Sequence, residues 1–127
     1  MRLFARFAVF VAACVLSLVA LASTVKYDKA AFDRAVAAGD PVIVQFHADW
    51  CPTCKAQAPI VSELLREPRM KDVKFFVADF DSEHALKKSL RVMSQSTFVV
   101  FKGGHEVARS TGQTARPELE SLFGKAL

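Results

Sequence analysis

The chain has 127 residues, of which 52 % are hydrophobic and 24 % are charged, with 17 Lys plus Arg against 13 Asp plus Glu. This length fits one compact domain and excludes two folded domains. The apolar content, which includes eleven Phe, excludes an intrinsically disordered chain, because there is enough apolar surface to offset the entropy of ordering.

The first 22 residues have the layout of a secretory signal peptide. Two arginines are followed by a nearly unbroken apolar run, Phe7 to Ala22, which ends in Ala20-Leu21-Ala22. This order predicts cleavage after Ala22. The alternative is a retained membrane anchor: the run is shorter than the roughly 20 residues of a spanning helix, but tilt or bilayer thinning could accommodate it. We therefore expect residues 23–127 to form a domain that is periplasmic or secreted, or anchored facing the periplasm.

Without this leader, 15 basic and 13 acidic residues remain, so the net charge is +2 with the histidines neutral. No basic stripe is interleaved with aromatic residues, and Lys87-Lys88 is typical of a solvated helix face. Nucleic acid is therefore not an expected partner. A membrane is expected as a partner only if the amino-terminal segment is retained, and we expect a monomer.

The first half of the domain predicts a helix, a buried strand and a second helix. Asp28 is a good N-cap for an amphipathic helix over 29–38, which stops at Gly39, a favoured helix-ending residue. Residues 42–46 form a mostly apolar, β-branched run that is typical of a strand buried on both faces. From residue 51 to about residue 66, apolar residues recur at helical spacing. They are Ala56, Ile60, Val61, Leu64 and Leu65.

The second half predicts a strand over 73–80, a helix that begins at Ser82, a strand over 97–101, a short strand over 106–110 and a helix over 117–126. The last two strands are joined by a glycine-bearing turn, which indicates a hairpin. Strands that alternate with helices predict an α/β fold with a mixed central sheet and helices on both faces.

Cys51 and Cys54 are the two cysteines of this predicted domain, in an export context where disulfides persist. Their bridge would close a ring too short to restrict the unfolded chain, so its value must be chemical. If a helix begins at Cys51, both side chains share one face within disulfide reach, and Cys51 lies at the positive helix end. This position favours a thiolate, so Cys51 is the predicted nucleophile and Cys54, deeper and less exposed, the predicted resolving thiol.

The segment Ala48-Asp49-Trp50-Cys51-Pro52-Thr53-Cys54-Lys55, followed by Ala58-Pro59, resembles the active-site segment of the thioredoxin family, and the resemblance extends over roughly Tyr27 to Leu127. It implies a thioredoxin-like fold and thiol–disulfide exchange with protein substrates and a thiol redox partner. The residues that could modulate the cysteines or border the substrate surface include Trp50, Pro52, Thr53 and Lys55. No nucleotide-binding fingerprint is present, so no bound cofactor is expected.

The chain departs from the family pattern in the loop before the strand that begins at Thr97. Where the family has a cis-proline facing the cysteines, this sequence has Ser96, in Gln95-Ser96-Thr97. A cis bond before a residue other than proline costs about 2.5–4 kcal/mol, so the Gln95–Ser96 bond is predicted to be trans and the loop differently shaped. This changes the expected mode of gripping a substrate backbone.

Two further departures concern proton transfer. Gln45 stands at the position of the family's buried acidic residue, and Val77 stands at that of its lysine partner. Proton transfer to and from Cys54 must then use water or another group. His47 stands where the family has a tryptophan, and it is either a packed strand residue or a source of a proton near neutral pH.

An alternative is a redox-inactive or metal-loading binding module built on the same fold. Two thiols would need two further ligands to complete a structural zinc site. The candidates His47, His84, His105 and Asp49 show no metal-ligand spacing, so no metal site is assigned. Covalent haem is excluded because Lys55 stands where a histidine would be required.

Overall fold

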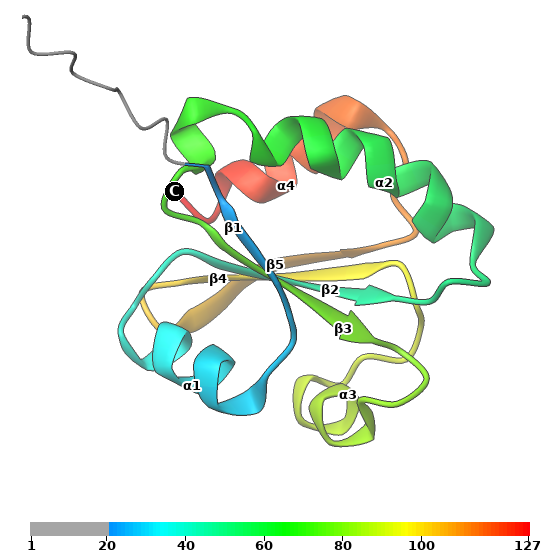
Figure 1. Cartoon of the computed structure of the whole chain (residues 1–127), viewed down its shortest axis with the longest axis horizontal. Helices are drawn as coiled ribbons and strands as arrows, with labels where there is room; N and C mark the ends of the chain where they lie inside the picture. Colours follow the sequence, from blue (N-terminus) through cyan, green and yellow to red (C-terminus); the bar gives the residue numbers. More distant parts are fainter. Residues whose placement is uncertain (1–20) are drawn as a thin grey trace, which may run out of the picture.

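The structure is a computed structural model, and it describes residues 21–127. These residues form a five-stranded sheet with helices on both faces (Figure 1). The strands are β1 Ser23–Lys26, β2 Val42–His47, β3 Lys74–Asp79, β4 Thr97–Lys102 and β5 His105–Thr111. The helices are α1 Lys29–Ala37, α2 Pro52–Leu65, α3 His84–Leu90 and α4 Arg116–Gly124, with a short 3-10 helix at Pro68–Met70. The predicted leader, residues 1–22, lies outside the described residues except for Leu21 and Ala22.

The strand order is β1-β3-β2-β4-β5, so β2 lies in the middle of the sheet. The strand pairs β1·β3 and β2·β3 are parallel, whereas β2·β4 and β4·β5 are antiparallel. Helices α2 and α4 cover one face and α1 and α3 cover the other (Figure 1). The predicted α/β fold, with a mixed central sheet and helices on both faces, is confirmed.

Side chains alternate across the sheet, so each face has its own apolar core. In β2, Ile43 packs with α2 and α4, and its neighbours Val42 and Val44 pack with α1 and α3. The first core contains a cluster of three rings, Phe75, Phe98 and Phe123, whose centroids lie 5.3–6.4 Å apart. These two cores hold β2 rigidly, and β2 leads directly into the cysteine segment.

The sequence pattern places most elements within one or two residues of their observed ends, but it misses β1. Ser23–Lys26 is short and exposed throughout, and it is held by backbone pairing to the edge of β3, from Ser23↔Lys74 to Lys26↔Val77. A strand of this kind leaves no alternating apolar pattern. The short 3-10 helix before β3 is missed in the same way.

The third helix begins later than predicted. Ser82 does not start it, because the Asp79 carboxylate accepts hydrogen bonds from the backbone N–H groups of Asp81 (2.8 Å) and Ser82 (2.9 Å) and holds them in a turn. These bonds lower the pKa of Asp79, the bond from Ser82 having the largest effect. The helix then runs from His84.

The second helix buries a different face from the predicted one near its start. Ala56 is exposed, and the polar residue Gln57 is fully buried instead. The buried positions are Cys54, Gln57, Val61, Leu64 and Leu65. Gln57 thus lies on the buried face of α2, three residues after Cys54.

None of the helices formed by residues 21–127 has both the length and the apolar character needed to cross a membrane.

Truncating Phe98 should be strongly destabilising, because it is fully buried and contacts two other rings. We expect Phe98→Ala to lower the free energy of unfolding by about 3–5 kcal/mol. Denaturant unfolding of the reduced protein measures this change. The control Val107→Ala, at a position that is 46 % exposed, should stay within about 0.5 kcal/mol of the parent. Equal stability of both variants would contradict the packing described here.

Candidate active site

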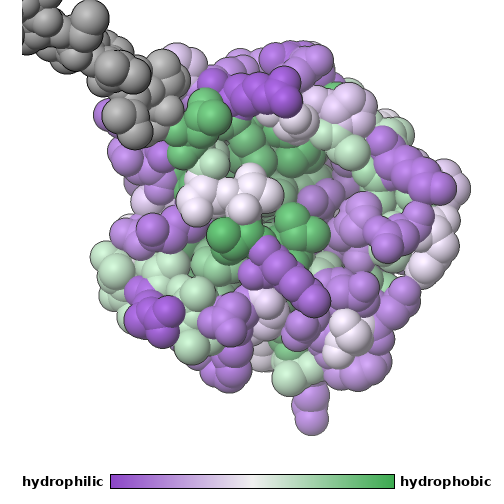
Figure 2. All heavy atoms as spheres, in the orientation of Figure 1, coloured by the Kyte–Doolittle hydropathy of each residue, from purple (hydrophilic) through white to green (hydrophobic). Residues whose placement is uncertain are grey.

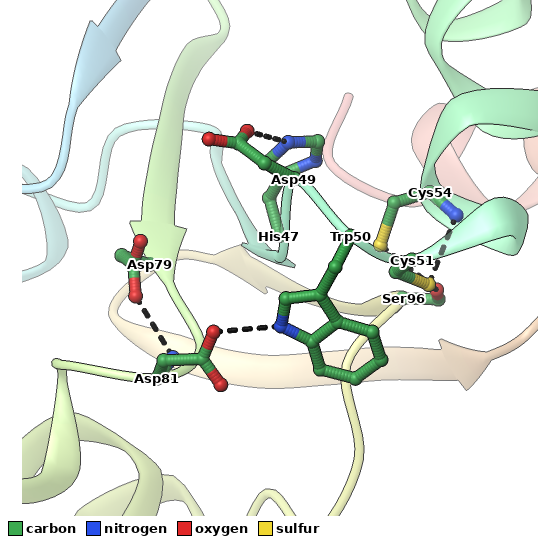
Figure 3. Close-up of polar contacts among 8 residues, drawn as sticks. All are labelled: His47, Asp49, Trp50, Cys51, Cys54, Asp79, Asp81 and Ser96. Carbon is green, nitrogen blue, oxygen red and sulfur yellow. Dashed lines mark hydrogen bonds and ion pairs between the residues drawn. The ribbon is translucent and has the colours of Figure 1, made fainter.

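Cys51 and Cys54 lie where β2 gives way to α2 (Figure 3). Cys51 is the N-cap of α2, and its Sγ accepts a hydrogen bond from the Cys54 N–H at 3.3 Å. Pro52 occupies the first helical position, where its missing N–H costs nothing. The predicted helix-end position of Cys51 and the shared face of the two thiols are therefore confirmed.

The two cysteines are free thiols and both are completely buried. The expectation that Cys54 is less exposed than Cys51 is therefore wrong. Ala48 and Phe80 pack around the pair, and the loop before β4 lies against both sulfurs. Burial alone does not distinguish the two thiols, so their difference must come from hydrogen bonding.

Ser96 brings a hydroxyl between the thiols. Its Oγ is 3.1 Å from Cys51 Sγ and 3.0 Å from Cys54 Sγ, and the residue is only 2 % exposed. None of the peptide bonds in residues 21–127 is cis, which confirms the predicted trans bond before Ser96. Ser96 has φ +61°, a left-handed conformation that the ring of proline cannot adopt. The loop is therefore incompatible with proline at this position.

The pKa of Cys51 is lowered from 9.0 to about 7. Burial by itself would raise this pKa, because it disfavours the charged thiolate. Hydrogen bonds outweigh burial: the Ser96 hydroxyl lowers the pKa most, followed by the backbone and thiol of Cys54 and the backbone of Thr53. Cys51 is thus about half ionised at neutral pH, and the thiolate is the reactive form of a cysteine.

Gln57 is a buried residue of the site that sequence reasoning missed. Its Nε2 donates to the carbonyl oxygens of Ser96 (3.3 Å) and Gln113 (2.8 Å). Rotating the amide by half a turn would place Oε1 against two acceptors, so the orientation is fixed. Oε1 itself is buried without a hydrogen-bond partner, an arrangement that costs about 1–3 kcal/mol. The available signal was its spacing of three residues from Cys54, on the inner face of the helix.

Trp50 borders the site on its solvent side and is 58 % exposed. Its indole N–H donates to Asp81 at 2.8 Å, which ties the cysteine segment to the turn after β3 (Figure 3). His47 lies at the end of β2, where its Nε2 is 3.0 Å from the fully exposed Asp49 carboxylate. The imidazole is therefore engaged with Asp49 and not with either sulfur.

Gln45 is buried in the sheet and lines a cavity of about 410 Å³ together with His47, Ala58 and Val77. Apolar side chains gather around β1 on the face shown in Figure 2. The side chains of Gln45 and Val77 in this cavity wall are an amide and an aliphatic group, and neither can exchange a proton.

The remaining predicted residues have mainly structural or peripheral positions. Pro52 and Lys55 are exposed on α2, and Thr53 is half-buried. Gln95 accepts a hydrogen bond from the Ser94 hydroxyl, and Thr97 bonds to the Ser94 carbonyl and to the hydroxyl of Thr111. These contacts fix the loop that carries Ser96. Across residues 21–127, no group of three or more His, Cys, Asp or Glu could hold a metal ion.

Comparisons of the sequence and of the structure with known proteins both find thioredoxins or thioredoxin-like proteins. Residues 23–125 match the thioredoxin family. The chain is 35 % identical over 82 residues to thioredoxin-2 of Saccharomyces cerevisiae, covering 64 % of this chain and 77 % of that protein. It is 33 % identical over 98 residues to thioredoxin of Mycobacterium bovis, covering 76 % of this chain and 84 % of that protein.

The solved structures include Trxlp from Edwardsiella tarda, which is similar with a TM-score of 0.77 and 39 % sequence identity. The match covers 80 % of this chain and 98 % of that one. The family match spans the sheet, the helices and both cysteines. The chain therefore belongs to the thioredoxin family and is a protein thiol–disulfide oxidoreductase.

Proposed function

We propose that Cys51 is the attacking thiol and Cys54 the resolving thiol. The observation that supports this assignment is the set of hydrogen bonds to Cys51 Sγ at the start of α2, from the Cys54 N–H and the Ser96 hydroxyl. Donors at this sulfur stabilise a thiolate, which is the nucleophile in disulfide exchange.

The reaction proceeds in two exchanges. Cys51 attacks one sulfur of a protein disulfide, the other sulfur leaves as a thiolate, and a mixed disulfide with Cys51 remains. Cys54 then attacks Cys51 Sγ and releases the second substrate thiol, leaving a Cys51–Cys54 disulfide. Two electrons have passed to the substrate, and a thiol redox partner returns them to the enzyme. Running the same steps backwards oxidises a substrate dithiol.

We further propose that the enzyme works outside the cytoplasm, after removal of residues 1–22. The charged start, apolar centre and small-residue end of this segment support the proposal. Ser23, the predicted mature amino terminus, is also the first residue of β1 and of the family match. Cleavage before Ser23 would leave every helix and strand described within residues 21–127 intact. A periplasmic or secreted monomer is the proposed form, with a membrane-anchored protein as the alternative.

The reactivity of Cys51 should follow its lowered pKa. The alkylation rate of the reduced protein should rise with pH, reach half its maximum near pH 7 and then level off, because only the thiolate reacts. Tandem mass spectrometry assigns the label to Cys51 or Cys54 at each pH. A midpoint near 9, the ordinary value for the thiol, or faster labelling of Cys54, would contradict the proposed roles.

Replacing the resolving thiol should trap the first intermediate. Cys54→Ser retains a hydroxyl at this position but cannot form the second disulfide, so mixed disulfides between Cys51 and substrate proteins should accumulate. Non-reducing electrophoresis detects them, and Cys51→Ser is the matched control that should form none. Trapping by Cys51→Ser but not by Cys54→Ser would reverse the assignment.

Export can be tested on the full chain expressed with its leader in a bacterium. Amino-terminal sequencing of protein from the periplasm should begin at Ser23. A matched variant with Arg2 and Arg6 changed to Glu should be exported poorly, because the positive start of the leader is lost. An intact chain that begins at Met1 in the membrane fraction would favour the anchor, and an intact chain in the cytoplasm would refute export.

A further inference from the structure

The Ser96 oxygen is almost equally distant from the two sulfurs of the site, at 3.1 Å from Cys51 Sγ and 3.0 Å from Cys54 Sγ. A hydroxyl has one proton to donate and two lone pairs that accept. Ser96 can therefore donate to one sulfur at a time and accept from the other. Rotation of the hydroxyl hydrogen alone is enough to exchange the two roles.

The frame around this hydroxyl is fixed by three hydrogen bonds of the Ser96 backbone. Its N–H donates to the Phe46 carbonyl in β2 at 2.8 Å. Its carbonyl accepts from the Gly112 N–H at 3.0 Å and from Gln57 Nε2 at 3.3 Å. The serine is also buried, so water does not compete well for its hydroxyl and the bonds to sulfur are strengthened.

The charged groups around the thiols are engaged elsewhere or exposed. His47 at the end of β2 pairs with Asp49, and Asp81 after β3 accepts from Trp50 (Figure 3). Lys55, one position after Cys54 in α2, is exposed. Among the side chains of residues 21–127 other than those of the two cysteines, only that of Ser96 hydrogen bonds to either sulfur.

We propose that the Ser96 hydroxyl hydrogen bonds to the two cysteines in turn. It donates a hydrogen bond to Cys51 Sγ in the reduced enzyme and to Cys54 Sγ in the mixed disulfide. This inference rests on the proposed roles of the two thiols. Once Cys51 is bonded to the substrate, its sulfur no longer carries a negative charge and becomes a weak acceptor. The hydroxyl then turns to Cys54, which becomes the next thiolate. One serine thereby stabilises the nucleophile of both exchanges.

The resolving step balances without any further reactant except water. The Cys54 thiol gives its proton to water, and the thiolate, held by Ser96, attacks Cys51 Sγ. The bond between Cys51 and the substrate sulfur breaks as the Cys51–Cys54 bond forms. Its electron pair leaves with the substrate sulfur, which takes a proton from water. The enzyme dithiol is oxidised by two electrons, the substrate disulfide is reduced, and the serine is unchanged.

The test separates the two exchanges with a symmetric nitroaromatic disulfide that releases a coloured thiolate at each attack. With protein in excess, the first equivalent of colour reports Cys51 and the second reports Cys54. Stopped-flow traces are recorded from acidic to strongly alkaline pH for the parent, Ser96→Gly and Ser96→Ala. Glycine adopts the positive φ of this position without strain, so it removes the hydroxyl and keeps the backbone, and alanine retains Cβ.

We expect both phases of the Ser96 variants to move to higher pH by about one to two pH units, as loss of a hydrogen bond to a charged group implies. At neutral pH both phases should slow by roughly tenfold or more, and in strong alkali all rates should converge because the cysteines ionise without help. The control Ser89→Ala removes an exposed hydroxyl in α3 that donates to the Leu86 carbonyl and bonds to neither sulfur, so it should leave both profiles unchanged.

A shift confined to the first phase, or slowing by the same factor at every pH, would overturn the inference. The first result would mean that the hydroxyl serves Cys51 alone, and the second that Ser96 acts only on the shape of the loop. Failure of the parent protein to release a second equivalent would instead refute the proposed roles of the cysteines, and the inference with them. The parent traces therefore distinguish the two failures.

Discussion

The proposed chemistry of this site depends on the hydrogen bonds of the Ser96 hydroxyl to the two sulfurs. Burial of Cys51 raises its pKa and so disfavours the thiolate. Among the groups that lower this pKa, the Ser96 hydroxyl has the largest effect. A hydroxyl can do so only if it is held within hydrogen-bond distance. That requirement explains why the loop keeps Ser96 at φ +61°, a conformation that is costly for a residue with Cβ.

Hydrogen bonds to the sheet and to α2 hold this loop in place. β2 is buried between two cores, and its Phe46 carbonyl accepts the Ser96 N–H at one end of the strand. The same strand leads into Cys51, so one rigid element positions both Cys51 and the serine whose hydroxyl bonds to its sulfur. Gln57 completes the arrangement from α2 by donating to the Ser96 carbonyl, even though its own carbonyl oxygen is left without a partner. The unpartnered oxygen of Gln57 thus lowers the stability of the fold, while its amide nitrogen holds the active-site loop in place.

Much of the fold was predictable because its signals are local. The N-cap Asp28, the buried apolar run of β2 and the Gly103-Gly104 turn each depend on a few neighbouring residues. β1 was not predictable, because an exposed edge strand is held by backbone bonds to β3 and carries no apolar pattern of its own. The start of α3 depends on a carboxylate from the end of β3, which propensity at Ser82 does not report.

The sequence by itself determined the cysteine spacing, the helix that begins beside Cys51 and the absence of proline before Thr97, since these follow from residue identity and helical geometry. Only the tertiary structure decided that Cys51 is as buried as Cys54, that His47 pairs with Asp49, and that Gln57 reaches the Ser96 loop. It also decided that a serine 42 positions beyond Cys54 lies between both sulfurs. The physical reason is that hydrogen bonds and burial depend on atoms that chain folding brings together from distant parts of the sequence, and local patterns carry no record of those distances.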